Sequence, residues 1–467
     1  MERYDLVILG GGAAGFAAAT EADRLGLKTA MVNGGLPMGG KCVNVGCVPS
    51  KHLLALGKAL RHPRHPPFQS VGPATPAFDF GKAMGEKDAL VLGLREQNYR
   101  QVLGSFGNVK WFEGRGTFSS SNVVKVNGRE MEGDKILIAT GCSTYAPPFE
   151  GLKETGFLTH IEALSLKNLP SSLIVFGVGP LGLEFSQIYS RMGAHVTVVA
   201  RGKRVLKTQE PEISEALRGY LEEEGIEIVT EARVVHVDRT NDGKMVTVET
   251  PEGRRTLTAE DILAATGERG NIEGLGLERI GVATVDDSYI RVNEFLQTSV
   301  PHIFTAGDVT GQRCLETVAA KQGKIAVENA FNGAKRKIDF LSVPHAVFTD
   351  PEAAGVGMTE EQYMAAYGTC NCRTVPLDRV PRAVAVRDTR GLVKMVAHHE
   401  TGKVMGVHIL APCASEMIHE ATLAVKMGLT VDDLIDTVHV FPTYSEAIKM
   451  AAQAFRRDIS NMSCCVE

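Results

Sequence analysis

Residues 5–15, DLVILGGGAAG, decide how the chain begins to fold. An apolar strand at 5–9 runs into a glycine turn, a helical pattern continues to Leu25, and a second strand follows at 28–32. In this strand–turn–helix–strand context, G-x-G-x-x-G is a fingerprint of dinucleotide binding. The sequence therefore predicts a doubly wound α/β domain at its start.

The glycines of this motif have separate expected roles. Gly10 makes the tight turn, Gly12 lets the backbone reach a pyrophosphate, and Gly15 lets the helix pack on the strand. The pyrophosphate would lie at the helix N-terminus, where free N–H groups bind anions. Asn33 stands where an acidic residue normally binds ribose, and because its amide can still hydrogen-bond a hydroxyl, it is kept as a candidate cofactor contact.

The same pattern recurs in the middle of the chain. A strand at 173–176 leads into Gly177, Gly179 and Gly182, and a helix and a strand at 195–199 follow. One such motif is weak evidence, whereas two in βαβ context indicate two dinucleotide sites. A duplicated fold with one inactive site is the alternative, which the two intact glycine sets disfavour.

The residues after the strand at 195–199 indicate which nicotinamide cofactor binds. An acidic residue there would bind the ribose 2′-hydroxyl of NAD. The chain instead has Ala200 and then three cations, Arg201, Lys203 and Arg204. Arginine holds a 2′-phosphate with paired hydrogen bonds. We therefore predict NADPH, with a solvated basic loop as the alternative.

Composition and charge limit the possible functions. The 467 residues are too many for one compact core, and 44% apolar with 22% charged residues is ordinary for a globular protein. A net charge of −5 disfavours nucleic-acid binding. No apolar run long enough for a membrane span occurs, and no leader precedes the first strand. The expected location is the cytoplasm.

Residues 39–51, GGKCVNVGCVPSK, carry the most specific signal. Cys42 and Cys47 flank a predicted turn into a helix, where they could close a disulfide or hold a soft metal ion, and a helix N-terminus lowers a thiol pKa. The segment resembles the redox-active disulfide segment of the flavin-dependent disulfide reductases, which include glutathione reductase, dihydrolipoamide dehydrogenase and mercuric reductase. The resemblance implies that Cys42 faces substrate, that Cys47 faces the flavin of FAD, and that Lys51 lies beside the flavin ring.

Further segments extend the resemblance over essentially the whole chain. Two near-copies ending in Ala-Thr-Gly, 134–141 and 261–267, resemble the points where family members pass between nucleotide domains. Asp308 resembles the aspartate that contacts the ribityl chain of the flavin, and Glu184 resembles the glutamate that pairs with the lysine matched by Lys51. The other implied cofactor contacts are Gly40, Thr140, Gly141 and Gly267.

The resemblance also implies a domain plan. Residues 1–145 form the first part of an FAD-binding domain, 146–266 an NADPH-binding domain, 267–340 the second part of the FAD-binding or central domain, and 341–467 a dimerisation domain. The expected fold class is α/β, with two doubly wound dinucleotide-binding domains and a C-terminal α+β dimerisation domain. In the family this last domain forms a homodimer whose active sites are completed by the partner subunit.

A segment near the C-terminus indicates the substrate. Relatives that reduce thiol disulfides have a His-Pro-Thr-x-x-Glu segment whose histidine protonates the leaving thiolate, whereas this chain has Phe441 at that position. Phenylalanine cannot transfer a proton. His439 would have to point the same way to replace it, and we interpret it as a loop histidine. Tyr444, in the same segment, completes the candidate catalytic set.

The chain carries a vicinal pair near its end, Cys464 and Cys465. Adjacent cysteines form only a strained disulfide, but soft thiolates bind soft metal ions. With Cys42 and Cys47, the pair of the partner subunit could hand Hg(II) to the active site, and reduction to Hg(0) needs no protonated leaving group. The combination resembles the mercuric reductases, with these four thiols as the candidate catalytic and metal-binding ligands.

Two other functions remain open. A large thioredoxin-reductase-like enzyme also has a redox pair on its C-terminal tail, but it relies on the histidine that Phe441 replaces. A non-catalytic, metal-sequestering flavoprotein is disfavoured by the intact cysteine pair, Lys51 and Glu184. The additional N-terminal metal-binding domain of many mercuric reductases is not expected, since the chain starts at the flavin strand.

The remaining cysteines are interpreted as structural or incidental: Cys142, Cys314, Cys370, Cys372 and Cys413. The C-x-C arrangement at 370–372 could bind a metal ion, but no second pair accompanies it in the sequence.

Overall fold

A mostly parallel sheet organises the first part of the chain in the computed structural model, which describes residues 1–241 and 243–458. Its seven strands are β1 (Glu2–Leu9), β2 (Thr29–Asn33), β3 (Val109–Glu113), β4 (Thr117–Ser120), β5 (Val123–Val126), β6 (Arg129–Ile138) and β18 (Ile303–Thr305). The order is β3-β2-β1-β6-β5-β4, and β18 also pairs with β6. Strands β1, β2, β3, β6 and β18 pair in parallel, whereas β4 and β5 form an antiparallel extension.

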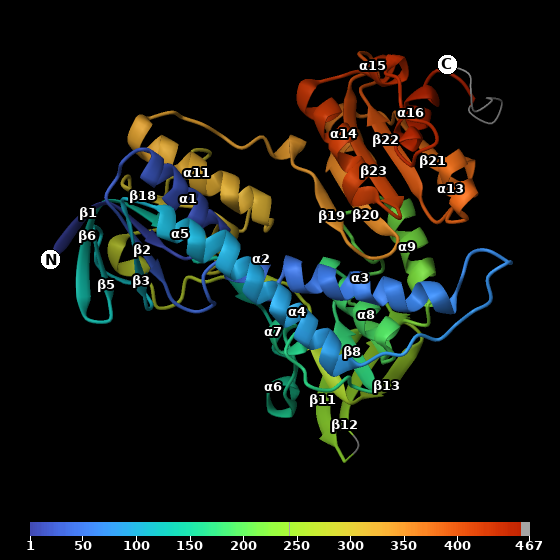
Figure 1. Ribbon diagram of the computed structural model, residues 1–467, viewed down its shortest axis with the longest axis horizontal. Helices are drawn as coiled ribbons and strands as arrows, with labels where there is room; N and C mark the ends of the chain where they lie inside the picture. The colour runs from blue at the N-terminus through green and yellow to red at the C-terminus, as the bar shows by residue number, and fades with distance from the viewer. Residues whose placement is uncertain (242, 459–467) are drawn as a thin grey trace.

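Two long helices pack together on one face of this sheet (Figure 1). They are α1 (Ala13–Arg24) and α11 (Glu316–Asn332). Their apolar side chains cover Ile8 and Met31, which are fully buried. The helix backbones approach closely at Gly323, where an added Cβ would lie 2.0 Å from the carbonyl oxygen of Ala14. Since α11 comes from far along the chain, the first unit is completed only by residues beyond position 300.

The middle of the chain builds a second parallel sheet with the order β10-β9-β8-β14. Its strands are β8 (Ser172–Phe176), β9 (His195–Val199), β10 (Glu227–Val229) and β14 (Asp261–Ala264), and its helices are α8 (Pro180–Met192) and α9 (Pro211–Glu223). A three-stranded antiparallel sheet extends this unit, with β11 (Arg233–Thr240), β12 (Gly243–Thr250) and β13 (Gly253–Ala259). The predicted strand at 195–199 is β9.

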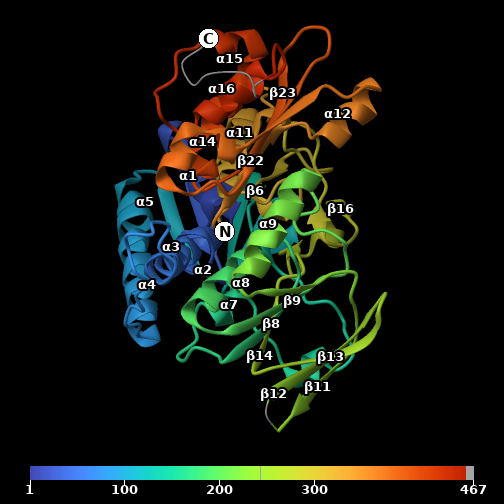
Figure 2. The ribbon, with the colours of Figure 1, turned by 90° about the vertical axis from the view of Figure 1, so that its right-hand side faces the viewer.

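The C-terminal part is an antiparallel sheet covered by helices (Figure 2). Its strands, in spatial order, are β19 (His345–Val347), β20 (Glu352–Gly357), β23 (Val404–Ala411), β22 (Leu392–Ala397) and β21 (Cys372–Pro376). Its helices are α12 (Glu360–Tyr367), α13 (Pro381–Val386), α14 (Ala414–Met427), α15 (Val431–Asp436) and α16 (Glu446–Gln453). The two parallel-sheet units and this α+β unit confirm the predicted fold class, while the predicted domain limits stay predictions.

A helical segment joins the first unit to the second (Figure 1). It comprises α2 (Gly40–Val45), α3 (Cys47–Arg64), α4 (Phe80–Arg95), the π-helical turn η1 (Glu96–Arg100) and α5 (Gln101–Ser105). Helix α3 packs on α8 and contributes Leu53 and Leu54 to the core around the second sheet. Because α3 begins at Cys47, the cysteine segment lies where the two units meet. Within the described ranges, no helix combines the length and apolar character needed to cross a bilayer.

Short elements complete the connections. They are α6 (Leu152–Thr155), α7 (His160–Ala163), α10 (Leu277–Ile280), β7 (Cys142–Thr144), β15 (Glu268–Gly270), β16 (Thr284–Val285), β17 (Tyr289–Ile290), η2 (Asp308–Thr310), η3 (Phe340–Ser342) and η4 (Leu377–Arg379). Strands β7 and β15 pair antiparallel, so the chain enters and leaves the second unit along one two-stranded ribbon.

A buried ion network joins the three units. Arg191 of α8 lies 2.7 Å from Glu224, which follows α9, and 3.0 Å from Asp350 in the C-terminal unit. Arg61 of α3 lies 2.9 Å from Glu224, and Arg390 lies 3.0 Å from Asp350. Burial raises the pKa of both carboxyls, but the guanidinium groups outweigh it and hold each pKa below its ordinary value. Each carboxylate is thus charged, buried and paired.

Removing one charge of this network should destabilise the whole chain. We expect Glu224→Gln to lower the free energy of unfolding by about 3–5 kcal/mol, because Arg191 would keep a buried charge without its main partner. The measurement is chemical denaturation followed by circular dichroism. Glu223→Gln, at the exposed neighbouring position, is the matched control. Equal stability of the two variants would contradict a structural role for the network.

The same network sets a pH dependence. Because the carboxyl pKa values of Glu224 and Asp350 are lowered on folding, their stabilisation is fully present above the ordinary carboxyl pKa of about 4 and is lost as pH falls through the lowered values. Glu224→Gln should therefore flatten the acid limb of the stability profile relative to Glu223→Gln.

Candidate active site

The glycine loop after β1 leaves a gap for a ligand. A Cβ added to Gly10 would lie 2.0 Å from the carbonyl oxygen of Ala139, and one added to Gly15 would lie 2.0 Å from that of Gly10. A Cβ on Gly12 would instead meet only the Cα of Gly40, at 3.7 Å. Two glycines therefore permit close packing, while Gly12 keeps the backbone open at the N-terminus of α1. This is the geometry that a pyrophosphate needs.

The second glycine loop repeats this arrangement. A Cβ on Gly177 would lie 2.3 Å from the carbonyl oxygen of Ala265, and one on Gly182 would lie 2.1 Å from that of Gly177. A Cβ on Gly179, immediately before α8, would meet nothing within 4 Å. The structure thus forms two equivalent loops, each open at its middle glycine. Both fit a dinucleotide pyrophosphate.

The three cations after β9 are available to a ligand. Arg201 and Lys203 are exposed, and Arg204 is half-buried. In the described part of the chain, none of the three forms an ion pair with a carboxylate. Their positive charge is therefore not neutralised by the protein, as expected of residues that hold a phosphate.

Asn33 is engaged within the first glycine loop. Its Oδ1 accepts a hydrogen bond from the N–H of Gly11 at 3.1 Å, and its Nδ2 donates to the carbonyl oxygen of Leu36 at 3.0 Å. The side chain is 8% exposed. Asn33 therefore holds the loop in shape, and its contact with a ribose stays a prediction.

The two Ala-Thr-Gly segments flank the β7–β15 ribbon, and each is hydrogen-bonded to a residue at the end of the opposite ribbon strand. The hydroxyl of Thr140 donates to the carbonyl oxygen of Asn271 at 2.8 Å, and that of Thr266 donates to the carbonyl oxygen of Tyr145 at 2.7 Å. Thr140, before β7, thus ties its segment to the end of β15, and Thr266, before β15, ties its segment to the end of β7. Gly141 and Gly267, which follow the two threonines, both have positive φ angles.

The cysteine pair lies at the junction of α2 and α3. Cys42 is in α2, and Cys47 is the first residue of α3. Both are free thiols, and each shifts the pKa of the other. The hydrogen bond from Cys42 lowers the pKa of Cys47, and the ammonium group of Lys51 lowers it further, whereas the same hydrogen bond and burial raise the pKa of Cys42. The geometry favours a thiolate on Cys47, stabilised by a protonated Cys42.

Lys51 of α3 and Glu184 of α8 form an ion pair although they are 133 residues apart in the sequence. The Nζ of Lys51 lies 2.7 Å from Oε2 of Glu184. The other carboxylate oxygen accepts the backbone N–H of Phe348 at 2.9 Å, and the Lys51 ammonium lies 4.5 Å from the centre of the Phe348 ring. Glu184 is 4% exposed. The predicted pair is therefore formed, and it lies one helical turn from Cys47.

Asp308 belongs to a polar cluster that the sequence did not predict. Its Oδ2 lies 3.3 Å from the sulfur of Cys142, which lies 3.0 Å from Glu268. Lys41 forms an ion pair with Glu268 and lies 3.4 Å from Cys142. Cys314 completes a set of four ligand atoms within 4.8 Å of one another. The contacts of Lys41 span 101 and 227 residues, so no local pattern could have shown them.

Two further groups near the cysteine pair were also not predicted from the sequence. Glu316, in the first turn of α11, contributes a negative charge that raises the pKa of both thiols. Tyr99, in η1, packs edge-on against Phe16 at 4.9 Å, and burial, followed by the charge of Cys42, raises its pKa to about 12. Both residues come from elements distant in sequence from α2 and α3.

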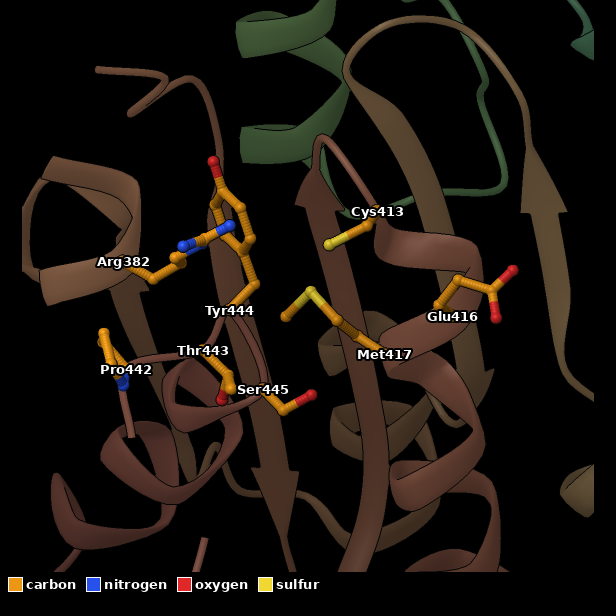
Figure 3. Close-up of a pocket in the computed structure, with 8 residues that line it drawn as sticks. All are labelled: Arg382, Cys413, Glu416, Met417, Pro442, Thr443, Tyr444 and Ser445. Carbon is orange, nitrogen blue, oxygen red and sulfur yellow. The ribbon is translucent and has the colours of Figure 1, made fainter. Parts of the chain in front are cut away.

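Tyr444 lies at a pocket of about 470 Å³ in the C-terminal unit (Figure 3). Its hydroxyl donates to the backbone carbonyl of Asp388 at 3.0 Å. The pocket is lined by Arg382, Cys413, Glu416, Met417, Pro442, Thr443, Tyr444 and Ser445. All of these belong to the C-terminal unit, so a role of Tyr444 at the cysteine pair stays a prediction. Cys464 and Cys465 lie outside the described residues.

Phe441 lies in an exposed apolar segment. It is 52% exposed, and Val438 and Val440 are 84% and 77% exposed. His439 is held in place, since its Nε2 lies 2.7 Å from Glu420 and its Nδ1 lies 2.9 Å from a backbone carbonyl. The hydrogen bond that His439 donates to the carboxylate of Glu420 raises the pKa of His439. Both ring nitrogens of His439 are engaged, as expected of a loop histidine.

Comparison with protein families accounts for nearly the whole chain. Residues 4–323 match the family of pyridine nucleotide-disulphide oxidoreductases, and residues 343–452 match the dimerisation domain of the same family. These two matches divide the chain where the parallel-sheet units end and the antiparallel C-terminal unit begins.

Similar curated proteins carry the name mercuric reductase. The protein of Lysinibacillus sphaericus is 39% identical over 464 residues, covering 99% of this chain and 85% of the relative. That of Streptomyces lividans is 41% identical over 471 residues, covering 99% of this chain and 98% of the relative.

Solved structures show the same architecture. The Cu(II) complex of the HOCl-induced flavoprotein disulfide reductase RclA of Escherichia coli superposes with a TM-score of 0.87 at 27% identity, covering 97% of this chain and 100% of that one. LpdA of Mycobacterium tuberculosis superposes with a TM-score of 0.84 at 32% identity, covering 97% and 99%.

The contacts around Cys47 predict how its thiol titrates. In the reduced protein, Cys42→Ala should raise the pKa of Cys47, because it removes the hydrogen bond that stabilises the thiolate, and Lys51→Met should raise it as well. Thiolate absorbance followed against pH measures both shifts. Lys58→Met, two turns further along α3, is the matched control. An unchanged titration in both test variants would exclude the assigned stabilisation.

Proposed function

Because the chain belongs to the pyridine nucleotide-disulphide oxidoreductase family, we propose that it reduces Hg(II) to Hg(0) with NADPH as the electron donor. Membership of this family makes the protein a flavin- and pyridine-nucleotide-dependent oxidoreductase. The finer assignment of FAD, NADPH and Hg(II) is our proposal. A reaction that consumes NADPH and needs reduced thiols fits a cytoplasmic location.

The cysteine pair beside the Lys51–Glu184 ion pair is the observation that carries this proposal. Two free thiols at the junction of α2 and α3, each shifting the pKa of the other, offer a soft metal ion two sulfur ligands. Reduction of a disulfide substrate would also need a proton for the leaving thiolate. The chain has Phe441 where relatives have the histidine, and His439 has both ring nitrogens engaged. A metal ion is therefore the better substrate for this site.

The two glycine loops are the proposed cofactor sites. FAD fits the loop around Gly12, with Asp308 as the candidate contact for its ribityl chain, and NADPH fits the loop around Gly179. When bound, FAD supplies the route by which two electrons pass from NADPH to the cysteine pair. Arg201, Lys203 and Arg204 are the candidate ligands of the 2′-phosphate. The proposed domain limits remain 1–145, 146–266, 267–340 and 341–467.

The described residues have separate proposed tasks in the reaction. Cys42 receives Hg(II) from outside, and Cys47, whose thiolate is favoured by Cys42 and Lys51, becomes the second sulfur ligand. Glu184 neutralises and orients Lys51, which keeps a positive charge at the start of α3. The net reaction is Hg(II) + NADPH → Hg(0) + NADP⁺ + H⁺, so both electrons come from the nicotinamide. No proton has to be given to a leaving group.

The dimerisation domain indicates a homodimer. Exposed apolar side chains on α14 and the segment after α15 fit such an interface, namely Leu423, Met427, Val438, Val440 and Phe441. We propose that each active site is shared between subunits and that Cys464 and Cys465 of the partner subunit deliver Hg(II) to Cys42 and Cys47. This delivery role follows from the thiols in the sequence.

The free cations after β9 predict the preferred nicotinamide. NADPH should exceed NADH in kcat/KM by about ten- to a hundredfold, because charge-assisted contacts with the 2′-phosphate contribute about 1.5–3 kcal/mol. Arg201→Glu should erode the preference, and Lys207→Glu, at an exposed position of the same loop, should not. Steady-state kinetics with both nucleotides measures this preference as the ratio of the two kcat/KM values. Equal efficiency of NADPH and NADH in the unmodified enzyme would overturn the assignment.

The substrate proposal is tested by turnover. Purified protein should oxidise NADPH in the presence of Hg(II) and excess thiol and should release volatile Hg(0), whereas glutathione disulfide, lipoamide and oxidised thioredoxin should give little turnover. Cys42→Ser or Cys47→Ser should abolish the release of Hg(0). Vigorous reduction of a disulfide substrate would favour a thioredoxin-reductase-like enzyme, and stoichiometric NADPH oxidation would favour a metal-sequestering protein.

The tail cysteines have a distinct expected effect. Replacing Cys464 and Cys465 by serine should slow turnover most when Hg(II) is bound to competing thiols, because only thiolate exchange removes those ligands. Turnover of weakly ligated mercury halides should change less. Ser463→Ala is the matched control. If the variant with serine at Cys464 and Cys465 turns over thiol-bound Hg(II) as fast as Ser463→Ala, delivery by the tail is excluded.

A further inference from the structure

A second thiol pair lies in the C-terminal unit, at the beginning of β21. The sulfurs of Cys370 and Cys372 are 3.3 Å apart, and the sulfur of Cys370 lies 2.6 Å from Oε1 of Glu360. The three ligand atoms lie within 4.8 Å of one another. Cys370 is exposed, and the other two residues are half-buried, so the group is accessible from solvent.

Secondary structure holds both sides of this group in place. Glu360 begins α12, whose N-terminus is capped by Thr359 in a reciprocal capping box with Gln362. Cys372 begins β21 and pairs with Val396 of β22. The helix start and the strand start are thus fixed independently, and Cys370 lies in the loop between the two elements. Glu360 lies ten residues before Cys370 in the sequence, so the C-x-C pattern itself does not include this third ligand.

Lys394 orients the carboxylate. Its Nζ lies 2.5 Å from Oε2 of Glu360, and the side chain is 1% exposed, held also by Glu210 and Glu212. With Oε2 fixed by the lysine, Oε1 faces the sulfurs.

We propose that Cys370, Cys372 and Glu360 bind one soft divalent metal ion at the surface of the C-terminal unit, apart from the cysteine pair of α2 and α3. Thiolates select soft d¹⁰ ions, and metal binding displaces the thiol protons. Two sulfurs at 2.3 Å from a tetrahedral ion are about 3.8 Å apart, which the observed 3.3 Å approaches, whereas a disulfide requires about 2.05 Å. The inference rests on these three residues and is independent of Hg(II) reduction.

Three protein ligands leave one tetrahedral position open. A closed structural site has four protein ligands, whereas an open site binds a water molecule or an external ligand. Because Cys370 is exposed, a small thiol that carries a metal ion can reach the site and exchange its ligand. The expected occupant is therefore an exchangeable ion.

The test uses Cd(II), which the proposed reaction does not reduce. The protein is full-length and flavin-loaded, treated with reductant that is then removed, and carries serine at Cys42, Cys47, Cys314, Cys464 and Cys465, so that the four-ligand cluster around Asp308 loses a thiol as well. Titration followed by the thiolate-to-metal charge-transfer band should give one Cd(II) per chain at high affinity. Cys370→Ser or Cys372→Ser should abolish this band. Glu360→Gln should weaken binding by at least about tenfold, since even an indirect partner of a metal ligand contributes that much.

Matched variants separate the site from general effects. Cys413→Ser removes another thiol, and Glu361→Gln alters the exposed neighbour of Glu360, so neither should change the titration. Glu360→Asp keeps the charge beside Lys394 but withdraws the carboxylate from the sulfurs, and it should weaken binding without loss of thermal stability. Absence of a high-affinity Cd(II) band, or a band that survives both Cys370→Ser and Cys372→Ser, would overturn the proposal.

Discussion

A buried carboxylate must have a partner, and Glu184 meets this requirement across a junction between units. An unpaired charge at this depth would cost several kcal/mol. Lys51 from α3 and the backbone N–H of Phe348 from the C-terminal unit supply the partners. One side chain therefore fixes the start of α3, the glycine-loop helix α8 and the C-terminal unit relative to one another. Because Cys47 is the first residue of α3, the contact between Lys51 and Glu184 also holds the cysteine pair in position.

The parts of the structure that could be predicted from sequence are those with a local signal. Each glycine motif places its turn, its helix and its flanking strands within a few residues, because the backbone contacts at Gly10 and Gly177 permit no side chain. The spacing of Cys42 and Cys47 shows that they lie together, since the turn between them is short. Lys51 and Glu184 were paired through family resemblance, and the structure joins them.

The remaining contacts could not be predicted because they join segments far apart in the chain. Asp308 meets Cys142 and Glu268 through pairing of strands whose relative placement no single segment determines. Glu360 completes the second thiol group only because α12 begins where β21 begins, a juxtaposition set by the antiparallel sheet. The loop contacts of Asn33 were likewise not predicted: its amide holds the glycine loop, while its contact with a ribose stays a prediction.

The return of β18 to the first sheet has a consequence for biosynthesis. Strand β18 pairs with β6, and α11 packs on α1, so the first sheet lacks a strand and a covering helix until residues beyond 300 have left the ribosome. The strands of the second sheet are contiguous from Ser172 to Ala264 and need no later segment. During translation at about 5–20 residues per second, the second unit therefore has all of its strands several seconds before the first unit does. The unit that begins the chain is not the first to be completed.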